Sequence, residues 1–255
     1  MHRFLIKPED VNKDSLILTG DDAKHMLQVL RFKPGDVFLA FDTTGLEYEA
    51  EVVSTGKSSV TGKIIKVWQP GTEPEKEVIL FQGIPKADKM DWIIQKSVEL
   101  GVREIIPMVT QYSVIRLHDR GLDGKLERWN RIAREACKQS GRVRVPEVKT
   151  PMSYPDAVKL WSDRVKEETD ALTVYCYENE GKKCLKDLLI CYNISNIRTS
   201  GIFIGPEGGF SVEEVQLAQE HRFNPVSLGK RILRTETAAI AVLSVIMYET
   251  GEWKT

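Results

Sequence analysis

The sequence has few of the residues that metal sites and disulfide frameworks require. Its 255 residues include four cysteines and four histidines, and no two cysteines form a CxxC pair. A structural zinc site needs several such ligands at short, regular spacings, so we expect no metal. We expect reduced thiols, as is usual in a cytosolic chain, at Cys137, Cys176, Cys184 and Cys191.

Long hydrophobic runs are also missing. The longest apolar run, Ala238 to Met247, contains Ser244 and falls short of the roughly 20 residues that a membrane helix needs. The first ten residues, MHRFLIKPED, lack the apolar stretch of a signal peptide. We therefore expect a soluble, cytoplasmic protein without a membrane partner.

A strong net charge is absent as well, because the chain carries a formal charge of -1. A polyanionic partner would have to bind a local patch. The segment from Arg116 to Lys149 offers one, with ten basic and five acidic residues. Its basic residues are Arg116, Arg120, Lys125, Arg128, Arg131, Arg134, Lys138, Arg142, Arg144 and Lys149. A solvated helix face and a nucleic-acid surface both explain this composition.

The residue pattern changes once along the chain. Residues 36–68 contain three β-rich runs, typical of a small antiparallel barrel, and a short helix is predicted at 21–30 before them. The stretch QPGTEPEK, residues 69–76, has no periodicity and is rich in proline and charge. We predict a β-rich domain, a linker and a second domain at residues 1–70, 71–76 and 77–255.

The second domain alternates strands with helices. Strands are predicted near 77–84, 103–109, 171–177, 201–205 and 225–228, and helices near 88–100, 125–139, 154–168, 211–221 and 236–249. Such alternation implies a mostly parallel sheet with helices on both faces, so the domain is α/β. The last helix is apolar nearly all round and must be buried on most sides or shared with another subunit.

A glycine-rich turn, GPEGGF, joins the strand near 201–205 to the next helix, whose start is marked by the capping box of Ser211 and Glu214. Gly208 and Gly209 allow a left-handed backbone or the close approach of a ligand. The turn contains neither GxGxxG nor GK[ST], which excludes the two familiar nucleotide loops. A simple turn and a ligand loop both remain open, because open α/β sheets bind small molecules at the carboxyl ends of their strands.

A second glycine-bearing loop, SLGKRILRTETAAI, follows the last predicted strand and occupies residues 227–240. Lys230, Arg231 and Arg234 lie beside Gly229 in it. Solvated loop charges explain these three cations as well as a binding site does, but two glycine-bearing loops after consecutive strands favour a common pocket. The sequence shows no Ser/His/Asp set and no evident nucleophile, which argues against hydrolysis through a covalent intermediate.

Four segments together carry a resemblance to a known family. In this order, and behind a small β-rich domain, they are PKADKMDWIIQKSVELGV, EACKQSGR, IGPEGGFS and LGKRILRTETA. They resemble the RsmE family of bacterial 16S ribosomal RNA (uridine-N3) methyltransferases. The sequence departs from the family pattern at Ala87, where glycine is common, and at Lys138, where many relatives carry an acidic residue.

The resemblance implies a fold and a set of partners. The expected fold is an N-terminal PUA-like β-barrel followed by a SPOUT α/β domain with a C-terminal trefoil knot. The expected cofactor is S-adenosylmethionine, the substrate is 16S ribosomal RNA of the small ribosomal subunit, and the protein is expected to be a homodimer. Two other functions stay open: a non-catalytic protein of RNA binding or ribosome assembly, and a 2′-O-methyltransferase of the same fold.

The resemblance also assigns site residues. Those expected to bind the cofactor are Gly205, Pro206, Glu207, Gly208, Gly209, Leu228, Gly229, Ile232, Leu233 and Arg234. The loop CYENEGKK should supply a third wall but matches the family weakly, so no residue is assigned there. For catalysis, Arg234 is expected to stabilise the N3 anion, and Glu207 or Glu99 is a candidate proton acceptor.

RNA contacts are expected from both domains. The N-terminal candidates are Arg3, His25 and Arg31, and the second domain adds Lys86, Lys89 and Arg142. An exposed polar helix face is the competing interpretation for His25 and Arg31.

Overall fold

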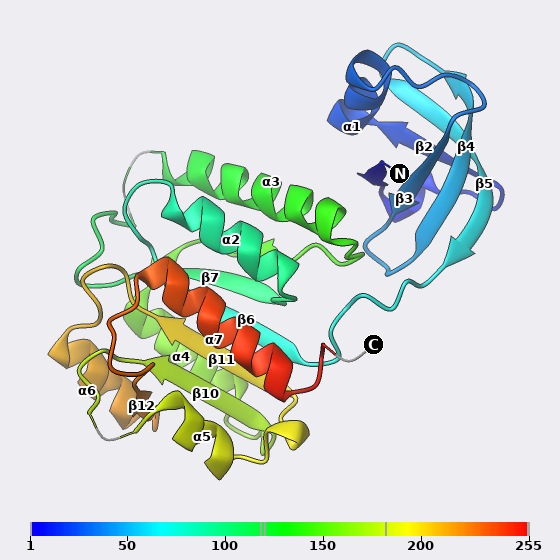
Figure 1. Ribbon diagram of the computed structural model, residues 1–255. Helices are drawn as coiled ribbons and strands as arrows, with labels where there is room; N and C mark the ends of the chain where they lie inside the picture. Colours follow the sequence, from blue (N-terminus) through cyan, green and yellow to red (C-terminus); the bar gives the residue numbers. More distant parts are fainter. Residues whose placement is uncertain (1, 118, 120, 182, 254–255) are drawn as a thin grey trace. The chain divides into compact units, whose positions relative to one another are not determined.

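The computed structural model describes residues 2–117, 119, 121–181 and 183–253. They form two units (Figure 1). The first unit comprises the chain up to Glu73 together with Arg134–Val145, and the second comprises Pro74–Ala133 and the chain from Pro146 onward. The break after Glu73 falls inside the 71–76 stretch. The sequence prediction had no means of separating 134–145 from the second domain.

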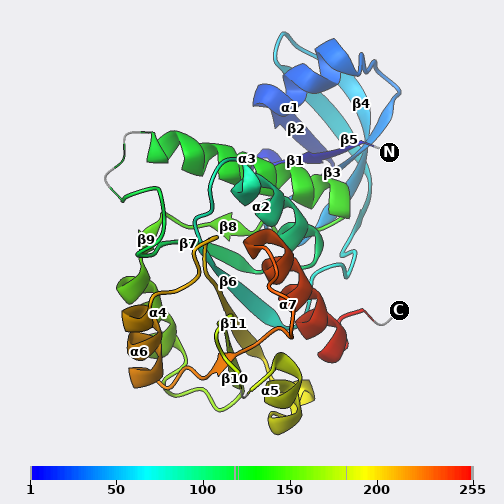
Figure 2. The same cartoon turned by 60° about the vertical axis from the view of Figure 1, so that its left-hand side comes forward.

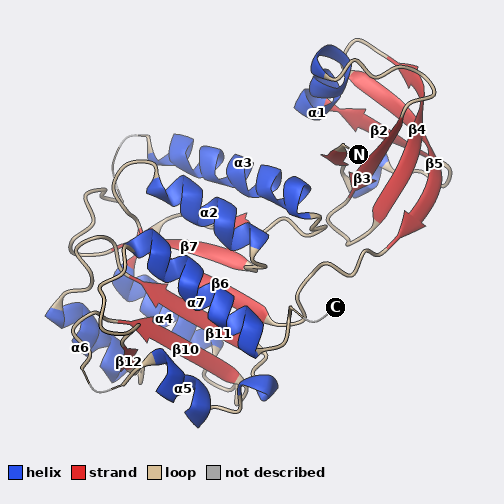
Figure 3. Ribbon diagram, in the orientation of Figure 1, coloured by secondary structure: helices blue, strands red, loops and turns tan. Residues whose placement is uncertain are grey.

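The first unit is built on a curled five-stranded sheet (Figure 3). Its strands are β1 (Arg3–Leu5), β2 (Ser15–Thr19), β3 (Val37–Phe41), β4 (Glu47–Thr55) and β5 (Ser59–Trp68). Their order in the sheet is β1-β3-β4-β5-β2, with β1 parallel to β3 and the other pairs antiparallel. Helix α1 (Gly20–Lys24) continues into a π-helical turn at His25–Val29, and a 3-10 turn spans Pro8–Asp10. The three β-rich runs and the short helix are confirmed, whereas β1 and β2 were not predicted.

Aromatic rings fill the core of this sheet. Phe4, Phe32 and Phe38 meet edge to face, with ring centroids 6.0 to 6.5 Å apart. Gly62 of β5 lies under Phe38, and a Cβ atom added there would be 2.9 Å from Phe38 Cζ. A glycine in the interior of this strand is therefore required by the ring that packs on it.

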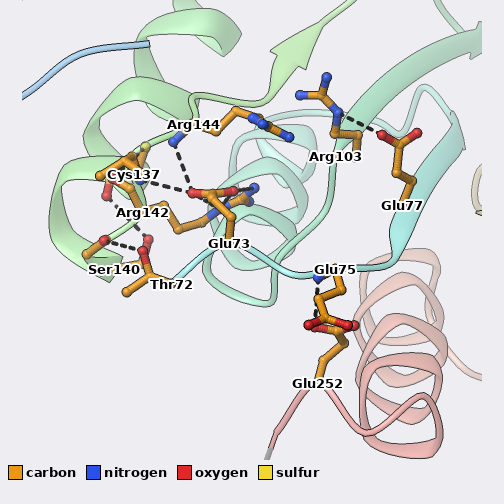
Figure 4. Close-up of polar contacts among 12 residues, drawn as sticks. Thr72, Glu73, Glu75, Glu77, Arg103, Cys137, Ser140, Arg142, Arg144 and Glu252 are labelled. Carbon is orange, nitrogen blue, oxygen red and sulfur yellow. Dashed lines mark hydrogen bonds and ion pairs between the residues drawn. The ribbon is translucent and has the colours of Figure 1, made fainter. Parts of the chain in front are cut away.

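The segment Arg134–Val145 contains the end of helix α3 (Leu122–Ser140) and the turn after it. Arg3 donates to the carbonyls of Lys138 and Gly141 at 3.0 and 3.2 Å and pairs with Glu47 at 2.6 Å. A cation is favourable there because the last carbonyls of a helix have no partner within it. Glu73 accepts hydrogen bonds from the Arg142 side chain and from the turn's backbone (Figure 4).

The second unit contains a parallel seven-stranded sheet. Its strands are β6 (Glu77–Gly83), β7 (Glu104–Val109), β8 (Glu147–Val148), β9 (Met152–Ser153), β10 (Ala171–Cys176), β11 (Thr199–Ile204) and β12 (Pro225–Val226). The order is β12-β10-β11-β6-β7-β8, with β9 also beside β7, and every pairing is parallel. The predicted α/β class and parallel sheet are confirmed.

Helices cover both faces of this sheet (Figure 2). They are α2 (Lys89–Glu99), α4 (Tyr154–Arg164), α5 (Leu185–Cys191), α6 (Val212–Glu220) and α7 (Thr235–Glu249), with a 3-10 turn at Ile194–Asn196. Helices α2 and α7 pack together on one side, and α4 and α6 on the other. Helix α5 and the short strands β8 and β9 were not predicted.

Successive residues of β6 point to opposite faces of the sheet, and both faces are buried. Ile79 and Phe81 face the α4 and α6 side, where Phe81 stacks on Phe203 with ring centroids 4.2 Å apart. Val78 and Leu80 are also fully buried. Helix α7 buries seven of its 15 residues, whereas Val245 and Tyr248 are exposed. No helix in the described part of the chain is long and apolar enough to cross a membrane.

Candidate functional site

A cavity of about 490 Å³ opens in the second unit at the carboxyl ends of β10, β11 and β12. Three segments line it: residues 176–178 after β10, residues 204–209 at the end of β11, and residues 227–235 between β12 and α7. Lys89 of α2 and Ala238 of α7 complete the wall. The volume suits a ligand the size of a nucleoside derivative.

The glycine-rich turn brings its backbone to the cavity because its neighbours leave no room for side chains. A Cβ atom added at Gly205 would lie 2.9 Å from the carbonyl carbon of Gly209, and one at Gly208 would lie 2.7 Å from Tyr112 Cβ. Gly209 has a φ of +68° and packs against the Glu178 carboxylate. Alanine at any of these positions would force the loop or its neighbours to move.

The exit of this turn is fixed by the predicted capping box, which is confirmed. Ser211 Oγ accepts from the backbone N–H of Glu214 at 3.2 Å, and the Glu214 carboxylate accepts from that of Ser211 at 2.9 Å. Its other oxygen accepts from the backbone N–H of Gln111 at 2.8 Å. Glu214 therefore ties the start of α6 to the segment that follows β7.

Glu207 is held by the segment between β6 and α2. Its carboxylate accepts from Lys89 Nζ at 2.7 Å and from the backbone N–H of Lys86 at 3.2 Å. Burial acts to raise the pKa of Glu207, but the hydrogen bonds from Lys89 and Lys86 outweigh it, so the pKa is lowered. In turn, the hydrogen bond to Glu207 raises the pKa of Lys89. Both groups are thus charged at neutral pH.

The segment 228–234 forms the opposite wall. Gly229 has a φ of +112° with open space around it, and Leu228 and Leu233 are half-buried. Ile232 lines the cavity but leaves 84% of its surface exposed. Arg234 is exposed, lines the cavity and precedes the first residue of α7. The positive charge of Arg234 acts to lower the pKa of Lys89, but the hydrogen bond to Glu207 outweighs this effect.

The structure brings together all ten residues expected to bind the cofactor, since each lines the cavity. The loop CYENEGKK was expected to supply the third wall, and its residues Cys176, Tyr177 and Glu178 line the cavity at the carboxyl end of the predicted strand, although none of them was assigned from the sequence. Cys176 is an inert thiol, because burial raises its pKa to about 12. In the described residues, no cluster of metal-ligating side chains occurs.

The six predicted RNA contacts differ in exposure, and Lys89 is the one that lies in the cavity wall, paired with Glu207. Arg3 and Arg142 leave only 11% and 4% of their side chains exposed and are paired inside the first unit. The expectation that they face RNA is revised, because their guanidinium groups stabilise the turn after α3. His25 and Arg31 are exposed on the first unit, and Lys86 is exposed on the second.

Ion pairs also reduce the free charge of the basic segment 116–149. The pairs are Arg128 with Asp88 and Asp91, Lys138 with Asp22 and Glu135, and Lys149 with Glu104 and Glu147. Arg131 and Arg134 are exposed on α3. Arg120 lies outside the described residues.

Comparison with known proteins adds the family context. The sequence profile of an RNA methyltransferase domain matches residues 72–247, and that of an RNA methyltransferase PUA domain matches residues 18–65. Ribosomal RNA small subunit methyltransferase E of Bacillus subtilis is 34% identical and covers 98% of this chain and 97% of its own. The protein of the same name from Mesomycoplasma hyopneumoniae is 32% identical, and the match covers 96% of this chain and 98% of that protein.

A solved structure shares the whole architecture. Ribosomal RNA small subunit methyltransferase E of Neisseria gonorrhoeae, crystallised bound to S-adenosyl methionine, superposes with a TM-score of 0.84. The two chains are 31% identical, and the match covers all of both.

Proposed function

The chain belongs to the ribosomal RNA small subunit methyltransferase E family, also called RsmE, and from this premise we propose that it methylates N3 of a uridine in 16S ribosomal RNA with S-adenosylmethionine. The observation that carries the proposal is the cavity at the carboxyl ends of β10, β11 and β12. Two of its three walls are formed by the glycine-bearing loops that carry the family resemblance.

The residues present fit this cofactor. The backbone of 205–209 and 228–234 offers N–H and C=O groups for an adenine and a ribose, and Leu228 and Leu233 offer apolar contact. The wall carries charges of both signs, the carboxylates of Glu178 and Glu207 and the cations of Lys89, Lys230, Arg231 and Arg234, and the amino-acid end of S-adenosylmethionine likewise carries an amine and a carboxylate. When bound there, the cofactor supplies a methyl group that is already activated for transfer.

The chain's own task is then to hold the uridine and help its N3 proton leave. N3 lies on the Watson–Crick edge, so the base must be unpaired before it reacts. We assign Arg234 to stabilise the N3 anion, because its exposed cation lies at the cavity. Glu207 is a weak base with a lowered pKa, and Glu99 is engaged by Lys96 at 2.8 Å. We therefore assign Glu207 to hold the loop through Lys86 and Lys89.

The remaining parts of the proposal concern partners and topology. His25 and Arg31, exposed on the PUA unit, are the proposed RNA contacts there, with Lys86 beside the cavity. The protein is proposed to act as a cytoplasmic homodimer on the small subunit. The C-terminal trefoil knot and the 1–70, 71–76 and 77–255 division stay predictions.

Transfer of labelled methyl groups to small-subunit ribosomal RNA in vitro tests the function. The wild-type chain should label the RNA, and Arg234→Ala should lose labelling by about a hundredfold or more while calorimetry shows cofactor binding retained. Loss of cofactor binding in Arg234→Ala would make its role structural. Labelling of a ribose 2′-oxygen, or of nothing, would favour one of the two rival functions.

A further inference from the structure

A chain of buried hydrogen bonds joins the two walls of the cavity. Gln82, at the end of β6, donates from Nε2 to Thr235 Oγ1 at 2.9 Å, and Thr235 Oγ1 donates to the carbonyl of Gly205 at 2.6 Å. Gln82 Nε2 also donates to the carbonyl of Gly83 at 2.8 Å. Three segments that are far apart in sequence meet in this chain: the end of β6, the glycine-rich turn and the start of α7.

The orientation of each group in the chain is determined by its neighbours. The carbonyl of Gly205 can only accept, so the Thr235 hydroxyl must donate to it and accept from Gln82. A reversed Gln82 amide would place its oxygen against the carbonyl of Gly83, which also only accepts. The hydrogen bonds therefore run in one direction from Gln82 to Gly205.

The Gln82 end of this hydrogen-bond chain is shielded from water, and the other end reaches the cavity wall at Thr235 and Gly205. Gln82 has no exposed surface, and Thr235 is 5% exposed. Gln82 Oε1 is buried without a hydrogen-bond partner among the described residues. An unpartnered buried acceptor lowers stability, and an apolar side chain of similar size would avoid that cost. The amide is thus poorly explained by stability and better explained by the contact that its Nε2 makes.

The residues around the hydrogen-bond chain are closely packed and have little room to move. Gly205 packs on Gly209, and a Cβ atom at Gly83 would lie 2.6 Å from the Pro206 ring. On the other side, Thr235 directly follows Arg234, which lines the cavity. A change in the Thr235 to Gly205 contact would therefore shift the turn 205–209 relative to Arg234.

We propose that Gln82 and Thr235 form a positioning clamp that sets the spacing between the two cofactor-binding walls. This inference rests on the proposed function. Gln82 is not part of the cavity wall, so it acts through Thr235 and not by touching a ligand. Without the clamp, the turn and the start of α7 would sample other spacings, and the bound state would have to select the correct one.

Three variants of the full-length chain and one control test the clamp. Thr235→Val replaces the hydroxyl by a methyl group of similar size, Thr235→Ser keeps the hydroxyl, and Gln82→Met removes the amide. Ser97→Ala is the matched control, because Ser97 on α2 is fully buried and its Oγ has no hydrogen-bond partner among the residues that the structure describes.

The readouts are the calorimetric Kd for S-adenosylmethionine and the separate KM values for cofactor and RNA. Thr235→Val and Gln82→Met should each raise the Kd by about tenfold or more, with the cofactor KM rising and the RNA KM unchanged. The Kd of Thr235→Ser should stay within about threefold of the wild-type value, and the Kd of Ser97→Ala should equal the wild-type value. A protein that combines Thr235→Val with Gln82→Met should have a Kd no more than about twofold above that of Thr235→Val alone, because both changes break the same chain of hydrogen bonds.

If the wild type binds the cofactor, either of two results would overturn the clamp. One is a Kd for Thr235→Val equal to that of the wild type. The other is an equal rise of the Kd in Thr235→Ser and Thr235→Val, which would assign the effect to the packing of the methyl group. If the wild type does not bind S-adenosylmethionine, the proposed function fails first and the clamp fails with it.

Discussion

Replacing Gly205 by alanine should open the glycine-rich turn and weaken cofactor binding. A Cβ atom at this position would lie 2.9 Å from the carbonyl carbon of Gly209, 3.0 Å from its Cα and 3.2 Å from its oxygen. All three are backbone atoms, so no flexible side chain can move aside. The turn itself must shift by several tenths of an ångström to restore ordinary contact.

The size of the effect follows from that crowding. Forcing one extra carbon into a well-packed site costs about 1–3 kcal/mol. If cofactor binding requires the original backbone spacing between residues 205 and 209, this free-energy cost is paid on binding, and the Kd rises by about 5- to 150-fold. Isothermal titration of S-adenosylmethionine into Gly205→Ala measures this change, and thermal unfolding measures any part that appears as lost stability.

Gly124→Ala provides the matched control. Gly124 lies in α3 with open space around it and without a positive φ, so alanine there should stabilise the helix by about 0.5–1 kcal/mol. Its Kd should equal that of the wild type. A Gly205→Ala protein with a Kd within twofold of wild type and an unchanged Tm would refute the argument from crowding.

Three further predictions concern stability and reactivity. Glu73→Gln should destabilise by about 1–3 kcal/mol at pH 7: burial acts to raise the pKa of Glu73, but hydrogen bonds from the turn after α3 outweigh it and lower the pKa. The contribution of Glu73 to the free energy of unfolding is fully present above its unfolded pKa near 4.5 and is lost as the pH falls through the lower folded pKa. In urea denaturation, the difference in unfolding free energy between wild type and Glu73→Gln should therefore shrink in acid. A difference that grows in acid would contradict this. Ala87 has a φ of +55°, so Ala87→Gly should raise stability by about 0.5–1 kcal/mol in the same assay, and a loss of stability would exclude backbone strain there. Iodoacetamide at pH 8 should alkylate exposed Cys191 well before buried Cys176, whose pKa burial raises to about 12, as peptide mass spectrometry would show; equal rates would mean that the cavity wall opens readily.

Elements with a long periodic pattern could be predicted from the sequence. In α2, Met90, Ile94 and Val98 recur on one face and are all buried, and Gly101 follows its end with a φ of +98°. Strand β1, by contrast, has three residues, too few to show any period. Strands β8 and β9 have two residues each, and their place in the sheet depends on pairing with β7.

The cofactor walls were predictable where glycines report a backbone constraint. The third wall was expected from the loop CYENEGKK, but its residues could not be assigned, because 176–178 contain no glycine and their role depends on the strand that brings them to the sheet edge. Gln82 escaped notice for the same reason, since its partner Thr235 is 153 residues away. Arg3 was nominated as an RNA contact, but the tertiary structure places its guanidinium on the carbonyls of Lys138, at the end of α3, and Gly141, in the turn that follows.

The central claim is that the chain methylates N3 of uridine in 16S ribosomal RNA. Mass spectrometry of nucleosides from purified small-subunit RNA, compared between a parent strain and one lacking the gene, tests it most directly. The account predicts loss of 3-methyluridine and its return when the wild-type gene, but not the Arg234→Ala variant, is restored. Unchanged 3-methyluridine, or loss of a ribose-methylated nucleoside in its place, would contradict the account.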